Sequence, residues 1–107
     1  MKENEIVETI LGCAIKVHSA LGPGLLESTF EICLIHELSN AGVRANRQVP
    51  LPLIYDGVEL KVVEKLLPLH TAQLLSYLKL SKRKLGYLLN FNVVQMRDGI
   101  KRVVNNL

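Results

Sequence analysis

The sequence predicts a small α/β (α+β) fold in which a mixed β-sheet is flanked by about three helices. Apolar residues at helical spacing fill the first third of the chain, extended segments with Asp-Gly pairs follow, and a strand–helix–strand pattern lies in the second half. The chain has 107 residues, of which 49% are hydrophobic. That size allows one compact domain over residues 1–107, with a modest core of Leu, Ile and Val.

Two helices are expected first. Asn4 can cap the first helix, and Gly22-Pro23-Gly24 must end it, because proline and glycine continue a helix only at a cost. The second helix covers residues 25–41, and Gly42 suits a left-handed cap after it. The positions expected to face inward are Ile6, Ile10, Ala14, Val17 and Leu21 in the first helix and Phe30, Cys33, Leu34 and Leu38 in the second.

A β-hairpin is expected next. Residues 48–55 have extended character and contain Pro50 and Pro52, which lack backbone donors and so favour an edge strand. Asp56-Gly57 is a two-residue hairpin signal, and residues 58–63 follow it as the second strand.

A strand–helix–strand crossover completes the predicted sheet. Pro68 opens a third helix over residues 69–80, and residues 85–91 are apolar on both faces, as in a buried strand. This strand should lie parallel to the second strand of the hairpin, with a right-handed connection. An Asp98-Gly99 turn leads to a short last strand over residues 100–104. The positions expected to face inward on the third helix are Ala72, Leu75 and Leu78.

The composition sets only weak limits on function. The net charge is +3 and the pI is near 9.0, which is compatible with contact to a phosphate backbone but does not identify a partner. The first residues lack a signal-peptide pattern and no apolar stretch is long enough for a membrane span, so a cytoplasmic location is expected. Cys13 and Cys33 lie on separate predicted helices, and we expect both thiols to be reduced.

An acid and a lysine follow each other at strand spacing. Glu59 and Lys61 are two residues apart, so both side chains leave the same face of the predicted strand. Such a pair can hold a divalent metal ion while the lysine steadies a water or an anionic oxygen. A solvated cross-strand ion pair is the more common explanation of such a pair in isolation. Gln73 and Tyr77, four residues apart on one helix face, either brace the lysine, contact nucleic acid, or form a polar helix margin.

The other polar candidates also have structural explanations. Glu27 suits the positive end of the second helix, and His18 suits the negative end of the first. His36 and His70 show no metal-ligand spacing and receive no role. A basic group at the end of the third helix is either a solvated face or a patch that contacts nucleic-acid phosphates. Its members are Lys79, Lys82, Arg83 and Lys84.

In their order along the chain, these segments resemble the GxxExxY family from about residue 4 to residue 105. The name-giving motif reads Gly24-x-x-Glu27-x-x-Phe30, with Phe in place of the usual Tyr. The segments that carry the resemblance are VHSALGPGLLESTFE, RQVPLPLIYDGV, ELKVVEKLLPLHTAQLLSYLKL, LGYLLNFN and DGIKRVVN.

That family in turn resembles the RecB-like branch of the PD-(D/E)xK nucleases. The resemblance implies a shortened nuclease core and an ancestral hydrolysis of DNA that uses Mg²⁺ or Mn²⁺. It also assigns roles to residues of this chain. These are Glu27 and Glu59 as metal ligands, His18 as a further candidate ligand, Lys61 as the base that orients water or phosphate, and Gln73 and Tyr77 as the supporting pair.

One departure from the family affects the expected activity. In relatives, a segment about two strands long carries a metal-binding aspartate before the acid–lysine pair, whereas here Gly57-Val58 leads directly into Glu59. The only aspartates are Asp56 and Asp98, both in Asp-Gly turns. Strand alternation directs Asp56 and Glu64 to the face opposite Glu59. We therefore expect nuclease activity to be absent or greatly reduced.

The same departure predicts an association surface. Loss of strands leaves a sheet edge unpaired, and such edges favour pairing with another chain. We therefore expect a homo-oligomer in which the hairpin of residues 48–63 pairs across a two-fold axis. The alternative function is a non-catalytic protein-interaction or assembly module that keeps only the framework. A decayed copy without a retained task is a third hypothesis.

Overall fold

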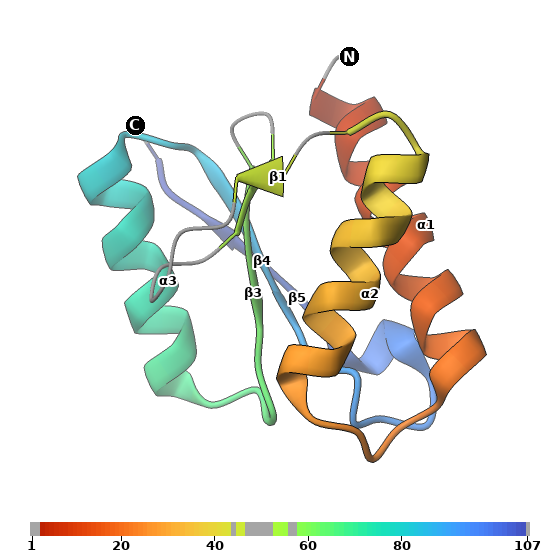
Figure 1. Cartoon of the computed structure of the whole chain (residues 1–107). Helices are drawn as coiled ribbons and strands as arrows, with labels where there is room; N and C mark the ends of the chain where they lie inside the picture. Colours follow the sequence, from red (N-terminus) through yellow and green to blue (C-terminus); the bar gives the residue numbers. More distant parts are fainter. Residues whose placement is uncertain (1–2, 44, 47–52, 56–57, 107) are drawn as a thin grey trace.

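A β-sheet with helices on both faces forms the centre of the fold (Figure 1). The computed structural model describes residues 3–43, 45–46, 53–55 and 58–106. In these residues the strands follow the order β1-β2-β3-β4-β5 across the sheet. The elements are α1 (Glu3–Leu21), α2 (Glu27–Asn40), β1 (Ala45–Asn46), β2 (Leu53–Tyr55), β3 (Val58–Val62), α3 (Pro68–Ser81), β4 (Leu85–Leu89), the 3₁₀ helix η1 (Met96–Gly99) and β5 (Ile100–Val104).

The strand pairing is mixed. β1, β2 and β3 are antiparallel neighbours, β3 and β4 are parallel, and β4 and β5 are antiparallel. Helix α3 connects the parallel pair, because parallel neighbours need a crossover that returns the chain to the same end of the sheet. The predicted mixed sheet, its crossover and its three main helices are therefore confirmed.

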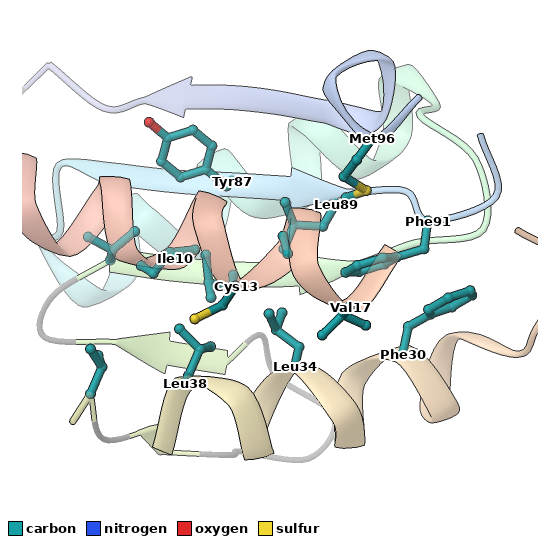
Figure 2. Close-up of a cluster of buried hydrophobic side chains, with 14 of the residues drawn as sticks. Ile10, Cys13, Val17, Phe30, Leu34, Leu38, Tyr87, Leu89, Phe91 and Met96 are labelled. Carbon is teal, nitrogen blue, oxygen red and sulfur yellow. The ribbon is translucent and has the colours of Figure 1, made fainter. Parts of the chain in front are cut away.

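The larger core cluster lies between the sheet and the pair α1–α2. Because side chains alternate along a strand, Val58 and Leu60 of β3 and Tyr87 of β4 face this cluster. Phe30 of α2 stacks on Phe91, just after β4, with ring centroids 4.7 Å apart. The helices complete the cluster through residues shown in Figure 2, among them Ile10, Cys13, Val17, Leu34 and Leu38.

A smaller cluster lies between α3 and the opposite face of the sheet. Leu74 and Leu78 of α3 pack there with Leu88 of β4 and Val103 of β5. All five residues of β4 are buried. The prediction of a strand that is apolar on both faces is therefore confirmed.

The inward side of α3 differs from the prediction. Leu78 is buried and Leu75 half-buried, but Ala72 is exposed and Leu74 is fully buried in its place. Leu74 and Leu78 are one helical turn apart and bury far more apolar surface than alanine does. The prediction for Ala72 was wrong because alanine carries little information about which side of a helix is buried.

Smaller differences occur in α1 and α2. Helix α1 begins at Glu3, so Asn4 lies inside its first turn and does not cap it. Leu21, expected in the core, is 38% exposed and lines an open pocket between α1 and α2. Cys33 is half-buried, and Cys13 and Cys33 are both free thiols.

The chain between α2 and β3 was predicted in part. Gly42 has a φ of +81°, which confirms the left-handed position after α2. Strand β1 was not predicted, and it pairs with Ile54 and Tyr55 of β2. The β2–β3 pairing confirms the hairpin, although residues 48–52 and 56–57 of that prediction lie outside the described part of the chain. None of the described helices is long and apolar enough to cross a membrane.

Gly86→Ala should lower the free energy of unfolding by about 1–3 kcal/mol, as overpacking of a core does. A Cβ atom at Gly86 of β4 would lie 3.1 Å from the backbone oxygen of Glu59 and 3.1 Å from Leu74 Cδ2. Urea unfolding followed by circular dichroism measures the change.

Gly12→Ala is the matched control. Nothing lies within 4 Å of a Cβ atom at this exposed position in α1, so alanine should stabilise the protein by about 0.5–1 kcal/mol. Equal effects of the two substitutions would contradict the close packing of α3 on β4.

Candidate active site

The acid–lysine pair lies on β3, beside the only parallel neighbour that the described strands contain. Glu59 and Lys61 leave the sheet on the face covered by α3, whereas Val58 and Leu60 face α1 and α2. The two side chains therefore share one face, as the sequence predicts.

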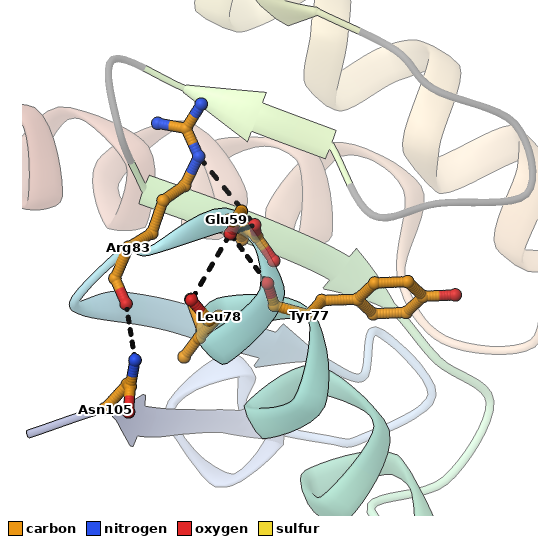
Figure 3. A network of polar contacts seen from close by, with 6 residues as sticks. Glu59, Tyr77, Leu78, Arg83 and Asn105 are labelled. Atoms are coloured by element: carbon orange, nitrogen blue, oxygen red, sulfur yellow. Dashed lines mark hydrogen bonds and ion pairs between the residues drawn. The ribbon is translucent and has the colours of Figure 1, made fainter. Parts of the chain in front are cut away.

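Lys61 contacts the middle of α3. Its Nζ donates a hydrogen bond of 2.8 Å to Oε1 of Gln73, so the amide braces the lysine, which was one of the predicted alternatives. Partial burial lowers the pKa of Lys61 below its ordinary value, because desolvation disfavours the ammonium form. Tyr77 is half-buried one turn further along α3, and its ring points away from Glu59 (Figure 3).

Glu59 contacts the end of α3 instead. Glu59 is buried, with only 2% of the residue exposed. Ser81 Oγ donates a hydrogen bond of 2.7 Å to Glu59 Oε1, and Arg83 Nε lies 3.8 Å from the same oxygen (Figure 3). The other carboxylate oxygen, Oε2, is buried and has no hydrogen-bond partner in the described part of the structure.

A pocket of about 330 Å³ lies where β3 ends. Glu27, from the first turn of α2, lines it together with Lys61. Glu64, which lies two residues beyond the end of β3, also lines this pocket, whereas Glu59 does not. The structure thus brings the helix acid Glu27 to the same pocket as Lys61, whereas Glu59 is enclosed by protein atoms.

Comparison with protein families supports the nuclease resemblance. The model of the PD-(D/E)XK nuclease superfamily matches residues 4–59 and 57–103. The chain belongs to the PD-(D/E)XK nuclease superfamily. The two matched segments of this PD-(D/E)XK chain overlap at residues 57–59, the position at which the sequence predicts that a segment of the family is absent. The comparisons with curated proteins and with solved structures gave no match.

The described residues of this PD-(D/E)XK chain do not fit a divalent metal ion. Nucleases of the superfamily generally use such ions, and Mg²⁺ needs several oxygen ligands at near-ideal geometry. Among the described residues no group of three or more His, Cys, Asp or Glu side chains could hold a metal ion. Asp98 is exposed in η1, and Asp56 lies outside the described part of the chain.

His18 contacts the segment that follows β4. It is buried at the last turn of α1, and its Nε2–H donates a hydrogen bond of 2.6 Å to the carbonyl oxygen of Val93. Nearby, the side-chain oxygen of Asn92 accepts a 2.8 Å hydrogen bond from the backbone N–H of Gly24. These bonds tie the segment after β4 to the turn that precedes Glu27, a connection that the spacing of residues in the sequence does not reveal.

The basic group at the end of α3 is divided in the structure. Lys79, Lys82 and Lys84 are exposed, whereas Arg83 is turned towards Glu59. His70, which received no role from the sequence, lines the pocket with Lys61. Its Nδ1–H donates a hydrogen bond of 2.8 Å to the carbonyl oxygen of Lys65. The sequence could have indicated His70 only through its position, in the first turn of the helix that follows the strand with Glu59 and Lys61.

We expect the pKa of Lys61 to lie below the ordinary value of a lysine side chain, and Gln73→Met to lower it further. The amide oxygen accepts a hydrogen bond from the charged ammonium, so its removal disfavours that form. NMR titration of ¹³C-labelled lysine side chains measures the pKa of Lys61 in the native chain and in the variant. A rise in the Lys61 pKa in the variant would contradict the assigned contact.

The sign of the pH effect on stability follows from the same shift. Between the lowered pKa of Lys61 and the unfolded value of about 10.4, the unfolded chain binds more protons than the folded one. The contribution of Lys61 to stability therefore rises with pH across this window.

Proposed function

We propose that this chain is a shortened nuclease-like domain of the GxxExxY type, spanning residues 1–107, whose ancestral reaction was metal-dependent hydrolysis of DNA. We further propose that its nuclease activity is lost or greatly reduced. The observation that carries the proposal is the separation of Lys61 from Glu59: the lysine lines an open pocket, while the acid is buried against Ser81 and Arg83.

The retained half of the site supports the nuclease ancestry. Lys61 is braced by Gln73 and shares its pocket with Glu27. A lysine held in this way can steady an anionic phosphate oxygen. Exposed Lys79, Lys82 and Lys84 supply charge for contact with the DNA backbone, the partner that this proposal implies.

The missing ligands support the loss of activity. Phosphodiester hydrolysis of this type depends on Mg²⁺ or Mn²⁺, which polarises the phosphate and lowers the pKa of an attacking water. Glu27 and Glu64 are the carboxylates in the pocket that holds Lys61, and no described group offers three ligands. Two carboxylates without the further protein ligand of the family site would bind such an ion more weakly than the complete site does.

A non-catalytic interaction module is the alternative function. It is favoured by an apolar pocket of about 360 Å³ between α1 and α2, which half-exposed side chains of Leu21 and Ile32 line. A titration with Mn²⁺ separates the two proposals. Binding that Glu27→Gln abolishes supports a residual nuclease site, whereas binding of a protein partner without metal supports the module.

We expect no cleavage of linear DNA above background in the presence of Mg²⁺ or Mn²⁺. Glu59→Gln and Lys61→Met, assayed in parallel, should give the same background, because no described group of three ligands can fix a metal ion in the site. Gel electrophoresis of end-labelled DNA measures the product. Efficient cleavage by the native chain that is lost in both variants would contradict the proposal of a degenerate site.

Self-association through a sheet edge is part of the same proposal. The hairpin is not a free edge along its whole length, because β1 pairs with part of β2. On the opposite edge, β5 carries exposed Lys101 and Arg102. Pairing of two β5 strands across a two-fold axis would bring these like charges close together and oppose pairing. We therefore place the association at the β1–β2 edge.

Light scattering after size-exclusion chromatography should give a mass that rises towards that of a dimer with concentration. Arg102→Glu should leave this mass unchanged, because it alters only the β5 edge. A monomeric mass at all concentrations would argue against self-association. A different mass for Arg102→Glu would indicate that the chains associate through the β5 edge instead.

A further inference from the structure

Glu59 is a buried carboxylate that needs a positive partner. A charge removed from water is costly unless it is paired and hydrogen-bonded. In a metal-dependent nuclease the ion supplies that charge, but the described residues around Glu59 do not form a metal site. The cation that lies beside it is the guanidinium of Arg83, with Nε 3.8 Å from Oε1.

The turn after α3 directs Arg83 towards Glu59. Lys82 adopts a left-handed conformation, with a φ of 56°, so the chain reverses immediately after Ser81. The backbone N–H of Arg83 then donates to the carbonyl oxygen of Leu78 at 2.9 Å. Ser81 and Arg83, on either side of Lys82, consequently both face the carboxylate.

The final strand fixes this turn from the other side. Asn105, just after β5, donates from Nδ2 to the carbonyl oxygen of Arg83 at 3.1 Å. Its backbone N–H donates to the carbonyl oxygen of Lys84 at 2.8 Å. Asn105 is itself buried, so the backbone that carries Arg83 is held by protein contacts (Figure 3).

Ser81 links the carboxylate to the helix end. Its Oγ lies 2.7 Å from Glu59 Oε1 and 2.6 Å from the carbonyl oxygen of Tyr77, with the carbonyl oxygen of Leu78 at 3.4 Å. A hydroxyl has one hydrogen, which these acceptors share. The contact therefore joins β3 to the last turn of α3 through a single side chain.

We propose that Arg83, together with Ser81, has taken the place of the metal ion as the partner of Glu59, and that Glu59 now anchors the end of α3 to the sheet. The inference rests on the proposed function only in treating Glu59 as an ancestral metal ligand. The contact itself stands on geometry. Glu59 is 2% exposed, accepts a hydrogen bond from Ser81, and lies at ion-pair distance from Arg83 Nε, which itself makes no hydrogen bond among the described residues.

A double-mutant cycle between positions 59 and 83 tests the anchor. Arg83→Gln leaves the buried carboxylate without a cation, so the melting temperature should fall by about 5–10 °C. In a Glu59→Gln background the same substitution should lower it by less than about 2 °C, because the charge that needs Arg83 is gone. Lys84→Gln, an exposed neighbouring cation, is the matched control and should change it by less than about 2 °C.

Equal effects of Arg83→Gln in the two backgrounds would overturn the proposal. If Arg83→Gln does not fold, Arg83→Lys replaces it in the cycle. Lysine keeps the charge but loses the guanidinium nitrogen beside Glu59, so Arg83→Lys should lower the melting temperature by less than Arg83→Gln does. If this decrease disappears in the Glu59→Gln background, it supports the anchor. If the decrease is the same in both backgrounds, it contradicts the anchor.

Melting in EDTA and in excess Mn²⁺ separates a protein partner from a metal partner. The melting temperature of the native chain should be the same in both, because Arg83 already occupies the position beside Glu59. A rise with Mn²⁺ that Glu59→Gln abolishes would overturn the proposal. These measurements contain no DNA, so they test the anchor independently of nuclease activity. DNA cleavage by the native chain would contradict only the proposed loss of activity.

Discussion

The parallel pairing of β3 with β4 is the constraint on which the site depends. Parallel neighbours require a crossover, and α3 supplies it by running back along the face of the sheet to the start of β4. The end of α3 therefore lies beside the start of β3, and its middle lies beside the end of that strand. This arrangement fixes which part of α3 meets Glu59 and which part meets Lys61.

Much of the fold could be predicted because its signals are local and apolar. Strand β4 is apolar at every position but Gly86, so burial on both faces follows from its sequence. Pro68 marks the start of α3 for a local reason, namely that proline suits the first helical turn. Strand β1 could not be predicted, since Ala45 and Asn46 have no strand preference and only pairing with β2 makes them a strand.

The candidate site likewise has a part that local patterns predict and a part that they do not. The contact of Lys61 with Gln73 could be anticipated because each residue belongs to a short periodic pattern, two residues on a strand and four on a helix. The surroundings of Glu59 could not, since they depend on a left-handed residue, Lys82, that turns Arg83 inward. Nothing in a run of basic residues distinguishes the half-buried one that contacts Glu59 from those that remain in solvent.

Under the proposal that Arg83 replaces the metal ion, the contrast between Glu59 and Lys61 explains how a nuclease fold can persist after its metal site is lost. A metal ligand that is already buried leaves an uncompensated charge when the ion no longer binds, and such a charge destabilises the fold. A cation from the protein removes this penalty without any change in the acid. In this chain the guanidinium lies beside Glu59, while Lys61 and Glu27 remain at an open pocket. The acid can therefore be retained for stability while the lysine stays accessible to a phosphate.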